Sequence, residues 1–211
     1  MLKLIRGVQE FQSGVFPTQR QMFAQLAQGQ HPEALFITCS DSRIDPNLIT
    51  NTDPGQIFVL RNIGNIVPPR GAAGDSEEAV IEYALTALGV KHVIICGHSH
   101  CGAMKGLLHP EGLASVPAVA SWLTHAEKTR RAVDEKFAHL QGEEQLEAAV
   151  AQNVIVQLEN LRTLPSVASR LASKQVQLHG WVYKIETGEV LALEPITGQF
   201  RPFAEAYRTF S

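Results

Sequence analysis

Two short apolar runs in this chain each lead into a side chain that can bind a metal ion. Residues 34–38 end at Cys39, and residues 92–96 are followed after one glycine by His98. Apolar runs of four to eight residues bounded by turn-forming residues are typical of buried strands. A helix is predicted over residues 75–88, just before the second run. Strands that alternate with helices pair in parallel, so both runs are expected to end at the carboxyl edge of a parallel sheet.

The remaining pattern predicts an α/β fold. The chain has 211 residues, of which 45% are hydrophobic, and we expect one domain over residues 1–211. Residues 1–30 have the apolar spacing of two short helices separated at Gly14 and Pro17, and they form an N-terminal helical arm. The rest predicts a mostly parallel sheet of about four to five strands flanked by helices. The other expected strands are 57–60, 176–185 and 190–193, and the other expected helices are 117–140, 145–161 and 165–172.

Composition argues against several kinds of partner. The formal net charge is −3 and there is no run of five or six Lys or Arg, so nucleic acid is not expected to bind. The N-terminus lacks the pattern of a signal peptide, and no window approaches the roughly 20 apolar residues that cross a bilayer. We therefore expect a cytoplasmic protein without membrane attachment. Three cysteines in such a chain favour metal binding, catalysis or simple burial over a disulfide framework.

The first apolar run is followed by Cys39-Ser40-Asp41-Ser42-Arg43, in which three side chains have complementary chemistry. In open parallel sheets, ligands bind beyond the carboxyl ends of the strands. Residues two apart point the same way along an extended backbone, so Cys39, Asp41 and Arg43 are predicted to line one side of such a crevice. A thiolate can bind zinc, and a carboxylate can bind zinc or accept a hydrogen bond. A guanidinium can hold that carboxylate through two parallel bonds.

The second apolar run is followed by His98-Ser99-His100-Cys101, whose His-x-x-Cys spacing offers two ligands to a single ion. Together with Cys39, this segment provides two sulfurs and one nitrogen. Three protein ligands and a fourth position left for water are typical of catalytic zinc. We therefore predict one zinc ion per chain, with zinc-bound hydroxide as the nucleophile. His100 is an alternative ligand, although the spacing favours His98.

Asp41 could serve this centre in two opposite ways. If Arg43 holds the carboxylate aside, Asp41 can accept a hydrogen bond from zinc-bound hydroxide and orient its attacking lone pair. If the carboxylate instead swings onto the metal, it takes the water position as a fourth ligand and closes the site. Both roles require a carboxylate at this position, and the sequence leaves the choice between them open.

Three separated motifs, at residues 39–43, 61–65 and 97–103, resemble the signature of the β-class carbonic anhydrases. They occur in order at compatible spacing, and the likeness runs through nearly the whole chain. Within the class, the sequence is most similar to bacterial enzymes of the plant-like branch, including cyanobacterial carboxysomal and cyanate-associated members. The resemblance implies reversible hydration of carbon dioxide to bicarbonate on zinc, in a homodimer or an assembly of dimers. It also raises the carboxysome as a location, with a carboxysome shell or scaffold protein as a partner.

The resemblance implies roles for individual residues as well. In the plant-like branch a glutamine, a phenylalanine and a tyrosine line the substrate pocket across the dimer interface, and by position these match Gln30, Phe58 and Tyr83. Apolar walls suit carbon dioxide, which has no net dipole, and one amide donor can polarise its oxygen. Some bacterial members bind a regulatory bicarbonate through a tryptophan three residues before the first cysteine, a place that Phe36 takes here. The family's zinc ligands fall on Cys39, His98 and Cys101, and its carboxylate–arginine pair falls on Asp41 and Arg43.

Two other functions are compatible with some of these residues. A closed zinc site, with Asp41 as permanent fourth ligand, would make the chain a catalytically silent scaffold or binding protein. A thiol enzyme would use Cys39 as a nucleophile beside Arg43. Phosphate-cradling loops place the arginine six positions after the cysteine, where this chain has Asp45, so the spacing argues against the thiol enzyme. Cys96, inside its apolar run, is expected to be structural.

Overall fold

The structure is a computed structural model that describes residues 1–72 and 75–208. The chain separates into two compact units, Met1–His31 and Pro32–Ser211. The first unit corresponds to the helical arm predicted over residues 1–30, and the second contains the sheet.

The arm is helical almost throughout, and its one interruption lies at Gln19, which leaves helical geometry at φ −111° and ψ 16°. The predicted break at Gly14 and Pro17 is therefore wrong. Proline has no N–H to donate to the carbonyl four residues earlier, and here the helix accommodates it by widening into a π-helical turn instead of ending. The segments are α1 (Leu2–Glu10), the π-helical turn (Phe11–Val15), α2 (Phe16–Thr18) and α3 (Arg20–Leu26).

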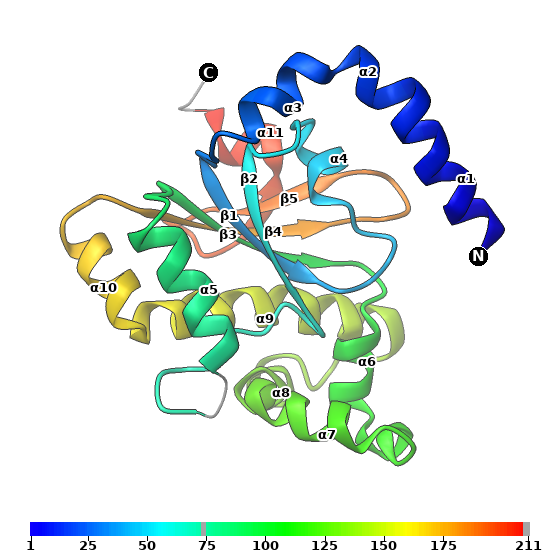
Figure 1. Ribbon diagram of the computed structural model, residues 1–211. Coiled ribbons are helices and arrows are strands. Elements are labelled where there is room, and N and C mark those ends of the chain that lie inside the picture. The colour runs from blue at the N-terminus through cyan, green and yellow to red at the C-terminus, as the bar shows by residue number, and fades with distance from the viewer. Residues whose placement is uncertain (73–74, 209–211) are drawn as a thin grey trace. The chain divides into compact units, whose positions relative to one another are not determined.

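The second unit is built on a six-stranded sheet with strand order β2-β1-β3-β4-β5-β6 (Figure 1). The first four strands in this order pair in parallel, and the last two pairings are antiparallel. The predicted mostly parallel sheet is thus confirmed. It has more strands than the four to five expected, because the sixth is three residues long and too short to show an alternating pattern. The strands are β1 (Ala34–Cys39), β2 (Ile57–Asn62), β3 (His92–His98), β4 (Gln177–Tyr183), β5 (Val190–Leu193) and β6 (Phe200–Pro202).

Helices flank this sheet, and the longest of them, α9, packs against β3 and β4 (Figure 1). The single helix expected over residues 117–140 is divided in two by a 3-10 turn at Thr124–Ala126. Among the described residues, no helix combines the length and apolar character needed to cross a membrane. The helices are α4 (Pro46–Thr50), α5 (Asp75–Thr86), α6 (Gly102–Leu108), α7 (Pro117–Leu123), α8 (Glu127–Lys136), α9 (Gly142–Thr163), α10 (Pro165–Ala172) and α11 (Phe203–Ala206).

Strand β1 is buried along its whole length because both faces of the sheet are covered there. Leu35 and Ile37 join the main core. Phe36 points to the opposite face and meets the ring of Trp181 from β4 edge-on, with ring centroids 5.8 Å apart. Burial on two faces explains why this strand is a continuous apolar run in the sequence instead of an alternating one.

The register of the parallel strands determines which residues meet at the carboxyl edge of the sheet. Thr38 of β1 lies opposite Cys96 of β3, and Cys39 lies opposite Asn62 of β2. Because both neighbours run parallel to β1, Cys39 and His98 leave the sheet at the same edge. The two segments singled out in the sequence are thereby brought together.

The close approach of α9 to the sheet requires a glycine in β4. A Cβ at Gly180 would lie 2.9 Å from Cδ1 of Leu158 and 2.9 Å from Cγ1 of Val154. We therefore expect Gly180→Ala to lower the free energy of unfolding by about 1–3 kcal/mol through overpacking. Urea denaturation measures this loss. Gly112→Ala is the matched control, since a Cβ there meets nothing within 4 Å. Equal midpoints for the two variants would contradict tight packing of α9 on β4.

Candidate metal centre

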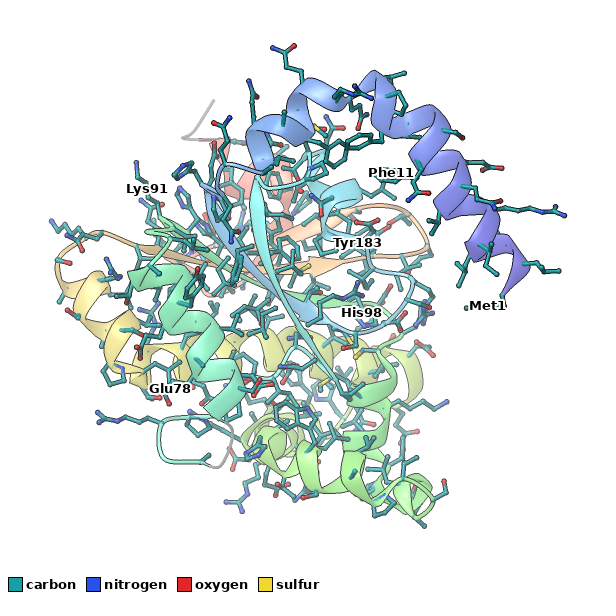
Figure 2. All side chains as sticks on the ribbon, viewed as in Figure 1. Met1, Phe11, Glu78, Lys91, His98 and Tyr183 are labelled. Carbon is teal, nitrogen blue, oxygen red and sulfur yellow. The ribbon has the colours of Figure 1, made fainter. Side chains whose placement is uncertain are left out.

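Cys39, His98 and Cys101 meet at the carboxyl edge of the sheet, and their ligand atoms all lie within 4.8 Å of one another. The exposed fractions of the three residues are 5%, 1% and 1%. Cys39 ends β1, His98 ends β3, and Cys101 is the residue that precedes α6. Figure 2 labels His98 where β3 gives way to α6. The three residues predicted as ligands therefore share one buried site, although their binding of zinc stays a prediction.

The tautomer of His98 can be assigned from its neighbours. Its Nδ1 lies 2.8 Å from the carbonyl oxygen of Ser99, which can only accept a hydrogen bond, so Nδ1 carries the proton. Nε2 therefore presents a lone pair. This atom is buried and has no hydrogen-bond partner among the described residues. A buried lone pair that faces two cysteine sulfurs is the donor set that suits a zinc ion.

The two cysteines shift each other's pKa in opposite directions. A hydrogen bond from the Cys101 thiol lowers the pKa of Cys39, and the Gly64 N–H, which donates to Cys39 Sγ at 3.4 Å, lowers it further. The same contact with Cys39, together with burial, raises the pKa of Cys101. Burial raises the pKa of Cys96 to about 12, so that this third cysteine stays a thiol.

Asp41 is held by Arg43 through two parallel hydrogen bonds, with Nε 2.9 Å from Oδ1 and Nη2 2.7 Å from Oδ2. The Arg43 backbone N–H also donates to Oδ1, at 3.0 Å. These bonds hold the pKa of the Asp41 carboxyl well below its usual range. Oδ2 of Asp41 lies 4.0 Å from His98 Nε2. The carboxylate thus lies beside the cysteine–histidine group while Arg43 occupies both of its oxygens.

A second arginine fixes the backbone around the first motif. Arg61 of β2 donates from Nε to the carbonyl oxygen of Cys39 at 3.1 Å and from Nη2 to that of Asp41 at 2.7 Å. Arg43 reaches across to the other motif, where its Nη2 donates to the carbonyl oxygen of His100 at 3.2 Å. The two arginines therefore tie the end of β1 to β2 and to the turn after β3.

The side chain of His100 pairs with carboxylates that do not belong to the cysteine–histidine group. Its Nδ1 lies 3.2 Å from a carboxylate oxygen of Glu143, and its Nε2 lies 3.5 Å from one of Glu186. Both ring nitrogens are thus beside surface carboxylates. His98 is the histidine that joins the two cysteines in this structure.

Comparison with known proteins identifies the family. The family model described as carbonic anhydrase matches residues 34–190. A carbonic anhydrase of Synechocystis is 53% identical over 201 residues, which cover 95% of this chain and 73% of the relative. The solved structure of the β-carbonic anhydrase CcaA superposes with a TM-score of 0.93 at 53% identity, over 96% of this chain and 98% of that chain. The chain belongs to the β-class carbonic anhydrases.

The family resemblance inferred from the three motifs is therefore confirmed. A further solved structure comes from work on two tetrameric β-carbonic anhydrases of Sordaria macrospora. It matches with a TM-score of 0.80 at 30% identity, over 92% of this chain and 98% of that chain. Likeness to the β-class carbonic anhydrases thus covers almost the whole chain, including both segments that supply the candidate ligands.

Phe58 and Tyr83 lie together, but not at the cysteine–histidine group of their own chain. They are two of the three residues that the resemblance to the plant-like branch places in the substrate pocket. The rings of Phe58 and Tyr83 are 6.0 Å apart, and Tyr83 is 51% exposed. Phe58 is in register with Leu35, four residues before Cys39, which places it roughly 13 Å back along the sheet. Gln30, the third, belongs to the separate unit Met1–His31.

Sequence reasoning missed three side chains that bind residues 64–67, the end of the second family motif and the segment that follows it. The Nδ2 atom of Asn153 donates to the carbonyl oxygen of Gly64 at 2.9 Å. Gln157 accepts from the Val67 N–H at 2.9 Å, and Asn160 donates to the Val67 carbonyl oxygen at 2.9 Å. These three amides lie on one buried stripe of α9. Their spacing of four and three residues within an apolar helix was the signal that could have revealed them.

Ser99 was missed as well, and it anchors the turn between His98 and Cys101, the two candidate ligands of the third motif. Its N–H donates to the carbonyl oxygen of Tyr183 at 2.9 Å. Its hydroxyl accepts from the Ile185 N–H at 2.9 Å and donates to Oε2 of Glu186 at 2.7 Å. The bond from Ser99 lowers the pKa of Glu186. Ser99 is buried, so these bonds connect the turn firmly to the end of β4.

Ser99→Ala should therefore lower the free energy of unfolding by about 1–3 kcal/mol, because the Ile185 N–H loses its partner. The pKa of Glu186 should rise toward its usual value, as measured by carboxyl NMR titration. Ser173→Ala is the control, since its exposed hydroxyl bonds only to carbonyls of its own helix and its loss should stay within about 0.5 kcal/mol. An unchanged Glu186 pKa in the Ser99 variant would contradict this anchor.

Proposed function

We propose that this chain catalyses the reversible hydration of carbon dioxide to bicarbonate and a proton, with one zinc ion held by Cys39 Sγ, His98 Nε2 and Cys101 Sγ. The observation that carries the proposal is the buried lone pair of His98 Nε2, which has no partner among the described residues and lies beside the two sulfurs. Membership of the β-class carbonic anhydrases supports the reaction. Zinc bound there would lower the pKa of a water molecule and so make hydroxide available near neutral pH.

Asp41 is proposed to orient the nucleophile. Its carboxylate accepts hydrogen bonds only, because an aspartate is ionised near neutral pH and the bonds from Arg43 lower the pKa of Asp41 further. It therefore acts by holding a donor hydrogen in place and not by taking up the proton. Arg43 in turn fixes both carboxylate oxygens, which keeps Asp41 from becoming a fourth ligand.

The substrate pocket is proposed to form between two copies of the chain. Phe58 and Tyr83 would supply apolar walls, and Gln30 an amide donor, to the site of the partner subunit. The exposed position of Tyr83, and the distance of Phe58 from its own chain's Cys39, support this arrangement. We accordingly propose a homodimer or an assembly of dimers, and the tetrameric relatives are compatible with it.

The cellular setting is part of the same proposal. We place the enzyme in the cytoplasm. Its sequence resemblance to carboxysomal members of the family extends the proposal to the interior of a carboxysome, with a shell or scaffold protein as partner.

Zinc binding is tested with ligand variants. Elemental analysis should find one zinc per chain in the unaltered protein, and His98→Ala and Cys101→Ala should each lose it because two ligands remain. Cys96→Ala is the matched control: Cys96 is fully buried but lies outside the ligand group, so this variant should keep its zinc.

Zinc retained by both ligand variants would contradict the assignment. A metal-free chain with full activity would favour the thiol enzyme instead. The structure gives that alternative little support, because Asp45 stands at the position where the thiol enzyme needs its arginine. Asp45 instead caps α4, where its side chain accepts hydrogen bonds from the backbone N–H groups of Asn47 and Leu48.

Activity is tested by stopped-flow measurement of carbon dioxide hydration with a pH indicator, under reducing conditions with zinc present. The unaltered chain should accelerate hydration strongly. Asp41→Asn should still bind zinc but lose activity by about 100-fold, because the amide cannot replace the carboxylate as an acceptor that Arg43 orients, and the nucleophile is then misplaced. Asp134→Asn, which changes an exposed carboxylate paired with Arg130 on α8, should keep full activity.

Two outcomes would contradict this account. Full activity of Asp41→Asn would show that the carboxylate does not orient the nucleophile. No acceleration by the zinc-loaded unaltered chain between pH 6.5 and 9 would instead favour the catalytically silent protein, in which Asp41 closes the site as fourth ligand.

A further inference from the structure

We infer that Trp122 is a positioning residue of the metal centre, because its indole N–H holds the peptide group whose own N–H points at the sulfur of Cys39. The inference rests on the proposed zinc site and adds a residue that binds neither metal nor substrate. Trp122 lies in α7, 21 residues after Cys101 in the sequence and outside all three family motifs.

The contact runs through a single peptide group. The carbonyl oxygen of Ile63 accepts a hydrogen bond from Trp122 Nε1 at 2.8 Å. The N–H of the same peptide group, that of Gly64, donates to Cys39 Sγ at 3.4 Å. In a trans peptide the carbonyl and the N–H point in opposite directions. The two hydrogen bonds therefore form one chain from the indole to the sulfur, in which each bond polarises the other.

The next peptide group along the chain is also held. Asn153 Nδ2 donates to the carbonyl oxygen of Gly64 at 2.9 Å. The amide of Asn153 cannot be reversed, since its Oδ1 accepts from Thr129 Oγ1 at 3.1 Å and from Gln157 Nε2 at 2.8 Å. Asn153 is 1% exposed. With Trp122 on one side of Gly64 and Asn153 on the other, the Gly64 N–H has a fixed direction.

Close packing explains why the donor to Cys39 is a backbone group. Gly64 has φ +81°, and a Cβ there would lie 3.0 Å from Cβ of Ala103 and 3.3 Å from Cε of Met104. Both neighbours belong to α6, the helix that Cys101 precedes. The backbone of Gly64 therefore approaches the metal-binding segment closely, and its N–H reaches the sulfur without a side chain between them.

The hydrogen bond to sulfur matters for the metal because two cysteines place two negative charges beside it. An N–H that donates to one sulfur draws electron density away from the metal and stabilises the thiolate form. Groups that bind the ligands of a metal, without touching it, typically change its affinity by about 10–100-fold. Removing the indole N–H should weaken the Gly64 bond and make the sulfur of Cys39 more electron-rich.

The test uses Trp122→Phe in the full chain, which keeps an aromatic ring and removes the indole N–H. The zinc dissociation constant, measured by competition with a chelator, should rise about tenfold, because the Cys39 thiolate is less stabilised and less firmly oriented once the Gly64 hydrogen bond weakens. In the cobalt(II)-substituted protein, the sulfur-to-cobalt charge-transfer band should move to longer wavelength. A change in packing alone would lower thermal stability without moving this band.

Trp181→Phe is the matched control, as Trp181 is the other of the two tryptophans in the chain. Its indole also donates a hydrogen bond, to the Tyr207 hydroxyl at 3.0 Å, and its ring packs on Phe36, on the sheet face away from the main core. This variant should keep the unaltered charge-transfer band and zinc affinity.

A second pair of variants tests the other side of Gly64. Asn153→Leu should move the band in the same direction as Trp122→Phe. Asn160→Leu removes a buried amide of the same helix that binds Val67 and not Gly64. This variant should leave the charge-transfer band in place.

The outcomes separate the two proposals. A charge-transfer band and zinc affinity that Trp122→Phe leaves unchanged would overturn the inference alone, whatever happens to thermal stability. Failure of the unaltered chain to bind cobalt or zinc would overturn the proposed zinc site and the inference with it.

Discussion

The parallel pairing of β1 with β3 is the constraint on which the candidate metal centre depends. Side chains alternate between the two faces of a strand, so a slip of one residue in this register would turn Cys39 to the opposite face. The register is defined by burial on both sides: Leu35 and Ile37 lie in the main core, and Phe36 packs against Trp181 on the other face. The positions of Cys39 and His98 at one edge therefore follow from apolar packing far from the metal centre itself.

The polar groups at this edge need more than the strands can provide. Two cysteine sulfurs and an imidazole are buried within 4.8 Å of one another, and buried polar groups are costly unless they are paired. Arg43 and Arg61 add positive charge at the surface of the same edge, where both bind backbone or carboxylate oxygens of the first motif. Among the described residues, His98 Nε2 keeps a buried lone pair without a hydrogen-bond partner, and the proposed zinc ion would satisfy it.

The sequence was sufficient to predict the parts of the site that depend on local pattern. The strand ends follow from apolar runs, and Cys39, His98 and Cys101 stand at positions that the chemistry of zinc ligands identifies. The sequence could not predict contacts between segments that lie far apart in the chain, because no repeating pattern links such segments. Trp122 meets Ile63 over 59 positions of sequence and Asn153 meets Gly64 over 89, and both contacts arise from tertiary packing alone.

Two errors in the predicted secondary structure have equally physical causes. The helix expected to span residues 117–140 keeps its apolar spacing through Thr124–Ala126, yet the chain there tightens into a 3-10 turn. In the arm, Pro17 was expected to end a helix and instead follows a π-helical turn. In both cases the apolar spacing continues through the irregular turn. The spacing alone therefore cannot show where the π-helical or 3-10 turn lies.

The second family motif, residues 61–65, supplies no candidate metal ligand, and the structure explains why such a segment accompanies the ligands. Arg61 holds the carbonyl groups of the first motif. The side chain of Asn62 closes the loop on both the N–H and the carbonyl of Ile66, at 2.8 and 2.7 Å. Gly64 and Asn65 adopt positive φ, at 81° and 47°, which turns the chain so that the Gly64 N–H faces the sulfur. Arg61 and Gly64 thus contact Cys39, a candidate ligand, through backbone groups, while Asn62 and Asn65 shape the loop that carries Gly64. This is why the motif consists of residues that shape or bind the main chain.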